Sequence, residues 1–433
     1  MRITLAAQWA DQPKLIQFGN WPPLFSVIYG AIIRVIPFPM EVGHVLTALC
    51  SSLVVFLSAL FSKMVFRSFP IAILTAVLIT FNSLHLSLAA SMLSEPFYTA
   101  LLLAFLMSAW KWSMSHQRQW LWCAIFFGIL MTMLRTDGTP IVLVFGLWLI
   151  WRQPGWKSVG ILLLLLTFPL LWVSILWKEF ASLPTLLKLY AEDSRRFYAS
   201  VPYWNWIPLL SLCKFFLLGL ISMSILLGLW KRIDQHARAI VLIALFCAIS
   251  QLYLLWNRVS TVFPERTLYT VGILFTIIEA FAVYSLWKIK PRLRILVAFA
   301  LILHFAFQIY FGKEITPNYS QKMVDIGNRL KSCLLLQSNL KTQRIATDLE
   351  DARYGVVAAI SGAPGRFTRF QFDSVNHQVS IKDPKPIPKY FLVGSEEAAK
   401  YIRGAWKTSA MIKLQSLWFI SDNQKVIFEL TKN

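Results

Sequence analysis

Long apolar runs separated by short polar loops make up most of the first 311 residues. Several runs approach the ~20 residues that an α-helix needs to cross the roughly 30 Å hydrocarbon core of a bilayer. The pattern therefore predicts an α-helical polytopic membrane protein with about ten transmembrane helices. We place them at 43–62, 69–83, 96–110, 120–134, 138–151, 158–177, 207–230, 238–256, 267–286 and 294–311.

Basic residues fall in every second loop between these predicted helices, beginning with Lys63 and Arg67 and continuing with Lys111 and Arg118. The positive-inside rule makes such loops cytoplasmic. The intervening loops are then external, and so are both ends of the chain. We therefore expect three parts: an external first loop (1–42), a transmembrane bundle (43–311) and an external C-terminal domain (312–433).

A shorter apolar run at 22–37 follows Trp21 and two prolines. If it crossed the membrane, the N-terminus would be cytoplasmic. Its apolar core is short, Arg34 falls inside it, and prolines stand at both of its ends. Tryptophan is enriched at membrane–water interfaces, and an amphipathic helix can lie on the surface without a full span. We therefore predict an interfacial helix within the external first loop.

The C-terminal part has frequent charges and only short apolar runs. Its pattern predicts strands alternating with helices, and about 120 residues suffice for a small α/β domain with its own core. The expected strands are 344–349, 355–361, 389–395, 416–421 and 425–430, and the expected helices are 319–336 and 395–406.

Composition supports the membrane class and limits the partners. Hydrophobic residues form 57% of the chain and charged residues 15%, against about 25% charged in ordinary soluble domains. The net charge of +21 would suggest nucleic acid in a soluble protein. Here the cations lie in the short loops, so we expect membrane lipids and no nucleic acid as partners. The five cysteines and six histidines show no spacing typical of a metal site.

Acidic residues are scarce before the tail, and most of them fall at external helix ends. Glu95 follows Ser94 and precedes Pro96, so Ser94 can cap a helix whose positive end favours the carboxylate. A plain helix start explains this pattern as well as a reactive carboxylate does. Glu279 is the exception, since it lies inside a predicted span. An ionisable group there is costly and usually functional, but no neighbour in the sequence offers it a partner.

Arginines at the predicted external face run against the positive-inside trend. Arg135 lies beside Asp137, and Arg258 precedes the pair Glu265 and Arg266. Arg135 and Asp137 can form a surface ion pair of small energetic value. Arginine is also a natural ligand for phosphate at the level of lipid headgroups. The sequence therefore predicts an anion site, with phosphate as the favoured ligand.

Four stretches in order resemble the GT-C superfamily: "NWPPLFSVIYGAIIRVIP", "SMLSEPFYTALLL", "MLRTDGTPIVLV" and "FPERTLYT". Members of this superfamily are polytopic glycosyltransferases that use polyprenyl-phosphate sugars, including mannosyltransferase-like and aminoarabinose transferase-like branches. The resemblance implies an inverting glycosyltransferase with a GT-C-like bundle. Its donor would be a polyprenyl-phosphate-linked sugar and its acceptor an external lipid, glycan or protein. By the same resemblance Glu95 matches an acidic catalytic position, Arg135 and Arg266 suit the lipid phosphate, and Trp21 heads a segment that forms one wall of the active site.

The beginning of the chain departs from that pattern. The first helix and the acidic pair at its outer end are absent, and Asp11 is the only acid before the Trp-Pro-Pro stretch. We therefore expect an N-terminally truncated chain, with Asp11 as a second candidate for the catalytic base. A chain without the acidic pair would be inactive.

Other functions and the setting of the protein stay open. A transporter or flippase for a lipid-linked or anionic solute is the main alternative, and a non-catalytic envelope scaffold is another. The resemblance leaves a divalent metal ion as the one conceivable cofactor. A bacterial inner membrane is the expected location.

Overall fold

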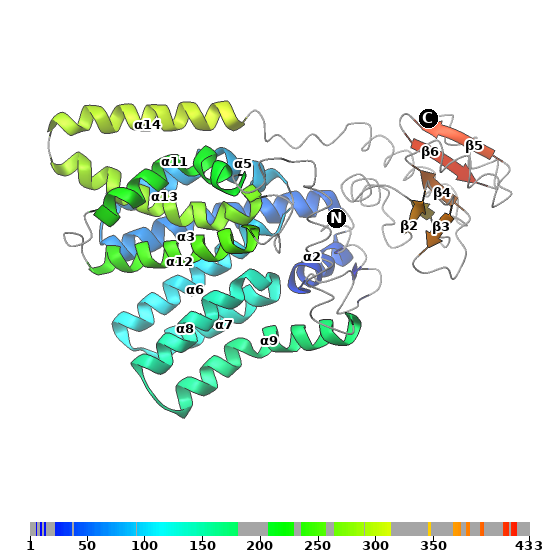
Figure 1. Ribbon diagram of the computed structural model, residues 1–433, viewed down its shortest axis with the longest axis horizontal. Helices are drawn as coiled ribbons and strands as arrows, with labels where there is room; N and C mark the ends of the chain where they lie inside the picture. The colour runs from blue at the N-terminus through cyan, green and yellow to red at the C-terminus, as the bar shows by residue number, and fades with distance from the viewer. Residues whose placement is uncertain are drawn as a thin grey trace. The chain divides into compact units, whose positions relative to one another are not determined.

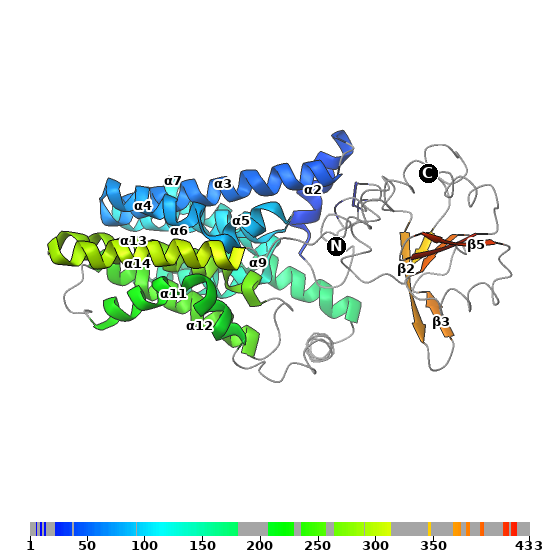
Figure 2. The same cartoon turned by 90° about the horizontal axis from the view of Figure 1, so that it is seen from above.

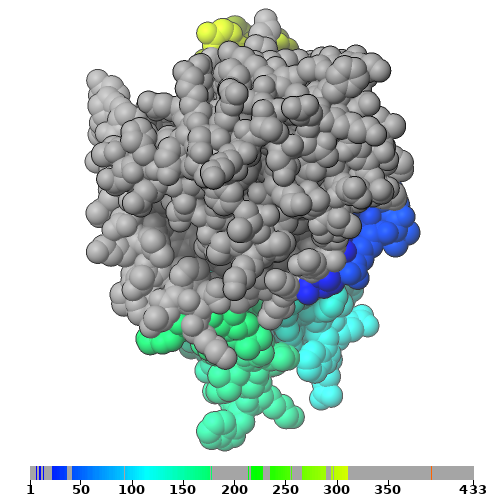
Figure 3. Space-filling model, turned by 90° about the vertical axis from the view of Figure 1, so that its right-hand side faces the viewer, coloured from blue at the N-terminus to red at the C-terminus, as the bar shows by residue number. Residues whose placement is uncertain are grey.

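The computed structural model describes most of the first 312 residues and six strands of the tail. The described ranges are 22–36, 39–91, 93–180, 207–228, 235–256, 264–289, 291–312, 345–347, 367–373, 378–381, 390–393, 410–414 and 417–421, with Ala6, Trp9, Ala10 and Pro13. The remaining residues are grey in Figures 1 and 2 and in the space-filling view (Figure 3). The chain divides into two compact units, one of residues 20–22 and 46–317 and one of residues 1–19, 23–45 and 318–433.

Helices occupy the ten ranges predicted from the apolar runs, with ends shifted by a few residues. In Figure 1 those of the first unit lie side by side as a bundle. Their bounds are α3 (Pro39–Phe66), α4 (Phe69–Thr80), α5 (Ser83–Ala90), α6 (Glu95–Ser115), α7 (Arg118–Leu134), α8 (Thr139–Arg152), α9 (Trp156–Phe180), α11 (Ile207–Gly228), α12 (Gln235–Trp256), α13 (Pro264–Ile289) and α14 (Pro291–Gly312), with a short 3₁₀ turn, η1 (Thr136–Gly138), before α8.

Four described helices are long and apolar enough to cross a membrane, and they lie within α3, α9, α12 and α13. A fifth candidate is the pair α4 and α5, which is bent by 61° at its break. The protein is therefore an integral membrane protein. Other helices are shorter: α8 has 14 residues and would extend only about 21 Å at 1.5 Å per residue. The count of ten spans stays a prediction.

Helix α13 is the centre of this unit. In its apolar window 67% of residues are buried, against 22–39% in the other three candidate spans. It packs against α4, α11, α12 and α14. Two glycines allow the close approach to α11. An added Cβ on Gly272 would collide with the ring of Phe216, and one on Gly219 would lie 2.9 Å from the Cβ of Phe275. Phe216 itself departs from helical geometry, with φ −135° and ψ 28°, at a kink in α11.

Glu279 has a partner that its neighbours in the sequence did not reveal. Its Oε1 lies 3.5 Å from Nδ1 of His304 on α14, and both side chains are buried. The sequence around Glu279 offered no partner because His304 is brought to it by the packing of the next helix.

The run after Trp21 forms α2 (Leu24–Val35). Its 12 residues extend about 18 Å, which is too short for a membrane span. Within the same unit, Arg34 Nε donates to the carbonyl oxygen of Ala10 at 2.7 Å, and the guanidinium lies 5.5 Å from the centre of the Trp9 ring. The position of α2 at the membrane surface stays a prediction.

The tail contains a mixed six-stranded sheet of order β3-β2-β1-β4-β6-β5. Strand β1 pairs in parallel with β2 and β4, and the outer pairs are antiparallel. The bounds are β1 (Ile345–Thr347), β2 (Phe367–Asp373), β3 (Gln378–Ile381), β4 (Tyr390–Val393), β5 (Ala410–Leu414) and β6 (Leu417–Ser421). Strands β1, β4 and β6 coincide with predicted strands. The predicted strands 355–361 and 425–430 and both tail helices lie outside the described residues.

Candidate functional site

Three charged residues that are distant in sequence meet at one end of the helical unit. Glu95 is the first residue of α6, Arg135 follows the last residue of α7, and Arg266 lies in the first turn of α13. Nη1 of Arg135 donates to Oε1 of Glu95 at 3.0 Å. Nε and Nη2 of Arg266 donate to the same oxygen at 3.0 and 2.8 Å. One carboxylate oxygen thus holds two guanidinium groups.

Arg135 also forms a forked pair with Asp137, the middle residue of η1. Its Nε and Nη2 donate to Oδ2 of Asp137 at 3.1 and 2.6 Å. The arginine side chain is only 8% exposed, so the pair is not the exposed ion pair that is worth little. Burial acts against the charged guanidinium, but Asp137 and then Glu95 outweigh it and raise the pKa of Arg135 above its usual range. Arg135 therefore stays positively charged throughout the physiological pH range.

The packing of α6 against α13 explains why Glu95 meets Arg266. Four residues after each of them come Thr99 and Thr270, which are hydrogen-bonded to one another through their hydroxyl groups at 2.8 Å. Residues four apart lie on the same face of a helix. The two helices therefore start side by side and run in the same direction. The equal spacing of four residues is a sequence signal for this contact. It becomes informative only when the two helices are known to be neighbours.

Two tyrosines near the cluster did not stand out in the sequence. Tyr98 is buried on α6, three residues after Glu95, and its ring centre lies 5.7 Å from the guanidinium carbon of Arg135. Tyr269 follows Arg266 by the same interval, and its hydroxyl lies 2.6 Å from Nδ1 of His85 on α5. The spacing of three residues from each charged group could have identified both tyrosines as neighbours of the site.

Not every predicted site residue can be placed. Asp11, Trp21 and Arg258 lie outside the described residues, and of Glu265 only the helical backbone is described. Ser94 occupies the position before α6, but its side chain makes no capping hydrogen bond. That part of the expectation was wrong: the backbone carbonyl of Ser94 accepts a hydrogen bond from the Tyr98 amide at 2.9 Å.

The cluster suits an anion better than a metal ion. Its carboxylates, Glu95 and Asp137, are engaged by arginines, whose positive charge repels a divalent cation. Within the described ranges no three His, Cys, Asp or Glu side chains form a group that could hold a metal ion. Guanidinium groups fixed by carboxylates are, in contrast, pre-oriented donors for phosphate oxygens.

Solved structures of one protein match this fold over nearly the whole chain. The apo structure of ArnT from Cupriavidus metallidurans matches with a TM-score of 0.61 at 10% sequence identity, covering 98% of this chain and 93% of that one. The structure of the same protein bound to undecaprenyl phosphate gives a TM-score of 0.63 at 11% identity, with the same coverage. No protein-family model and no curated protein matches the sequence. The expected GT-C-like fold is confirmed.

Proposed function

We propose that this protein is a glycosyltransferase that moves a sugar from a polyprenyl-phosphate carrier to an acceptor at the external membrane face, in a bacterial inner membrane. The observation that carries the proposal is the pair of arginines fixed on Glu95 at one end of the bundle. The fold adds support because ArnT, which this chain resembles in structure, has been solved with undecaprenyl phosphate bound.

The reaction would be a single in-line displacement. The hydroxyl or amine of the acceptor forms a bond to the anomeric carbon of the sugar, and the bond from that carbon to the phosphate oxygen breaks. The electron pair leaves with the polyprenyl phosphate, and the acceptor's proton passes to a carboxylate. Attack opposite to the leaving group inverts the anomeric centre. The negative charge that develops on the phosphate is stabilised by fixed cations, a role for which we assign Arg135 and Arg266.

The contacts of Glu95 favour a positioning role over the role of catalytic base. Its Oε1 already accepts three N–H donors, while an oxygen atom offers two lone pairs. Oε1 is therefore occupied by the two arginines, and the other carboxylate oxygen, Oε2, is buried within the protein. We propose that Glu95 orients Arg135 and Arg266 toward the phosphate, and that the base is another carboxylate, for which Asp11 remains the candidate in this sequence. Asp137, Arg258, Glu265 and Trp21 stay candidates for substrate binding.

The test is release of polyprenyl phosphate from a labelled polyprenyl-phosphate sugar, in vesicles that retain the native acceptors. We expect Arg266→Gln and Arg135→Gln to lower the rate by about 100- to 1,000-fold, as for loss of a donor to a developing oxyanion. Glu95→Gln, which keeps an oxygen acceptor for the arginines but loses the negative charge, should lower the rate by no more than the loss of both arginines does. Arg152→Gln, an exposed cation at the end of α8 and outside the cluster, should leave the rate unchanged.

Two outcomes would contradict these assignments. Release that survives Glu95→Gln and both arginine variants would rule out this cluster as the active site. Absence of release from every donor by the unaltered chain would rule out the proposed reaction.

A transporter of a lipid-linked or anionic solute is a second candidate, favoured by the buried pair of Glu279 and His304 between α13 and α14. Ionisable groups inside a membrane bundle often mark ion or substrate pathways. Solute uptake into liposomes that is abolished by Glu279→Gln, with no release of polyprenyl phosphate, would establish this candidate. Release that continues in Glu279→Gln would favour the transferase.

A further inference from the structure

A cavity lies at the opposite end of α6 from the Glu95 cluster. It has a volume of about 340 Å³ and is formed by α3, α6, α7, α12 and the link between α3 and α4. Lys111 on its wall follows Glu95 by 16 residues of one helix, which corresponds to about 24 Å along the axis. That separation is comparable with the thickness of a hydrocarbon core. The cavity is therefore distinct from the candidate active site and belongs to the other membrane interface.

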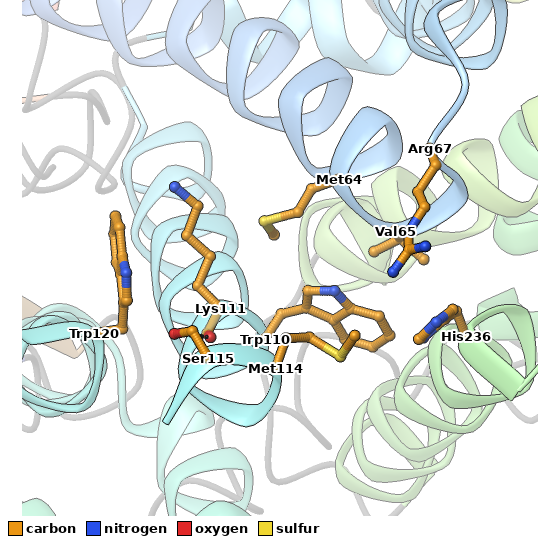
Figure 4. Close-up of a pocket in the computed structure, with 9 residues that line it drawn as sticks. All are labelled: Met64, Val65, Arg67, Trp110, Lys111, Met114, Ser115, Trp120 and His236. Atoms are coloured by element: carbon orange, nitrogen blue, oxygen red, sulfur yellow. Dashed lines mark hydrogen bonds between the residues drawn. The ribbon is translucent and has the colours of Figure 1, made fainter. Parts of the chain in front are cut away.

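Its lining combines cations with aromatic and flexible apolar side chains. Arg67 and Lys111 are exposed, and none of the nine lining residues is acidic. In Figure 4 Trp110 lies between Lys111 on one side and Arg67 with His236 on the other. The Lys111 ammonium lies 4.0 Å from the centre of the Trp120 ring. Tryptophans at the level of lipid headgroups, beside cations, are typical of a membrane–water interface.

Part of the wall is apolar. Met64 and Val65 on α3 and Met114 on α6 contribute it. A ligand for such a cavity needs a negative group for the two cations and hydrocarbon for the methionines and the valine. An anionic phospholipid has both parts, whereas a free anion has only the first. Basic pockets between membrane helices are known to take anionic lipid headgroups.

The backbone at Arg67 offers a variant that tests its side chain. Arg67 directly follows the last residue of α3 and has φ +50°, in the left-handed region that commonly ends a helix and favours Gly or Asn over other residues. Arg67→Asn therefore removes the charge while suiting the backbone.

We propose that this cavity binds the headgroup of an anionic phospholipid, with Arg67 and Lys111 as its phosphate ligands. The acyl chains would follow the apolar wall into the bilayer. The site does not depend on the proposed transferase reaction, so either can fail without the other.

The test is native mass spectrometry of the full-length protein in detergent, titrated with phosphatidylglycerol. Phosphatidylcholine serves as the zwitterionic control and inorganic phosphate as the free-anion control. Each cation near a lipid surface contributes about fivefold in affinity, so Arg67→Asn or Lys111→Gln should weaken one phosphatidylglycerol site about fivefold and both together about thirtyfold. Arg67→Lys should retain the site, because it keeps the charge.

Arg118→Gln is the matched control, since Arg118 is an exposed cation at the start of α7 that does not line the cavity. It should leave the affinity unchanged. Equal affinity in the double variant and the unaltered protein would overturn the proposal. So would an equal loss in Arg118→Gln, which would indicate a general basic surface. Displacement of the lipid by inorganic phosphate at equal concentration would show that a free anion, and not a lipid, is the ligand.

Discussion

At the scale of single residues, the charges around Glu95 depend on one another. Glu95 is 2% exposed and Arg135 8% exposed, and they are joined through one oxygen that also holds Arg266. The described cluster balances two guanidinium groups with two carboxylates, Glu95 and Asp137. Removing one partner of a buried pair leaves an uncompensated charge out of water, which costs about 3–5 kcal/mol.

We therefore expect Arg135→Ala to lower the free energy of unfolding by about 3–5 kcal/mol, because Asp137 would lose its arginine and Glu95 would keep only Arg266. Arg118→Ala, an exposed cation, should change it by less than about 0.5 kcal/mol. Denaturant unfolding in mixed micelles measures both. The pKa of Arg135 is raised from an already high value, so its contribution to the free energy of unfolding is lost only at strongly alkaline pH. The difference in unfolding free energy between the two variants should therefore be constant from about pH 6 to 9. Equal stability of the two variants would show that the cluster contributes nothing to folding.

The sequence could identify these residues but not their meeting. Glu95 stands out because acidic residues are scarce before the tail, and Arg135 and Arg266 stand out because they lie at predicted external helix ends, against the positive-inside trend. The bond from Arg266 to Glu95 joins positions 171 residues apart, and such a contact is decided by which helices pack together. The pairing of Glu279 with His304 was missed for the same reason. The local sequence pattern predicts where a residue lies on its own helix, but not which other helix packs against it.

At the scale of elements, α11 and α13 pack closely because Gly272 has no side chain. An added Cβ on Gly272 would fall on the ring of Phe216, at the kink of α11. Neither element can move away easily, because α13 is surrounded by α4, α12 and α14 as well. The kink in α11 and Gly272 in α13 therefore belong to the same packing contact.

Gly272→Ala should destabilise the protein by about 1–3 kcal/mol, the usual cost of overpacking a core. Gly160→Ala in α9 is the matched control, because no atom lies within 4 Å of its added Cβ. There the change should be neutral or stabilising by up to about 1 kcal/mol, since alanine favours helix. Thermal unfolding of both variants in detergent is the measurement. Phe216→Ala alone should cost about 3–5 kcal/mol, and adding Gly272→Ala to it should cost little more, because the ring that the new methyl group would meet is gone. A neutral Gly272→Ala would mean that α11 and α13 pack differently.

Elements of the two parts of the chain were predictable to different degrees. Apolar runs longer than about 14 residues leave little choice besides a helix, so all ten helical ranges were found. In the tail, β2, β3 and β5 were missed. At least half of the residues of β2 and β3 are polar, and β5 has only five residues. The order of the sheet was also not predictable, since β1 lies between β2 and β4 in parallel pairs formed across long connections.

At the scale of the whole molecule, two kinds of physical reasoning disagree on the number of membrane spans. The alternation of basic loops predicts ten crossings, while only four described helices, or five with the bent pair, meet the length and apolarity of a span. The pair α7 and α8 shows the conflict most sharply. They have 17 and 14 residues, or about 25 and 21 Å, both short of the roughly 30 Å core.

Labelling from one side of the membrane can decide between the two. In a chain whose own cysteines have been replaced, single cysteines would stand at Gln117, Thr136 and Gln153, which are exposed positions before α7, between the two helices and after α8. If both helices cross, an impermeant maleimide added to intact cells should label Thr136→Cys and should reach Gln117→Cys and Gln153→Cys only after permeabilisation. Labelling of all three from the same side would show that α7 and α8 enter the membrane without crossing it. If that common side is the cytoplasm, the result would also place the Glu95 cluster, whose Arg135 lies between these helices, on the face opposite to the one required for an external acceptor.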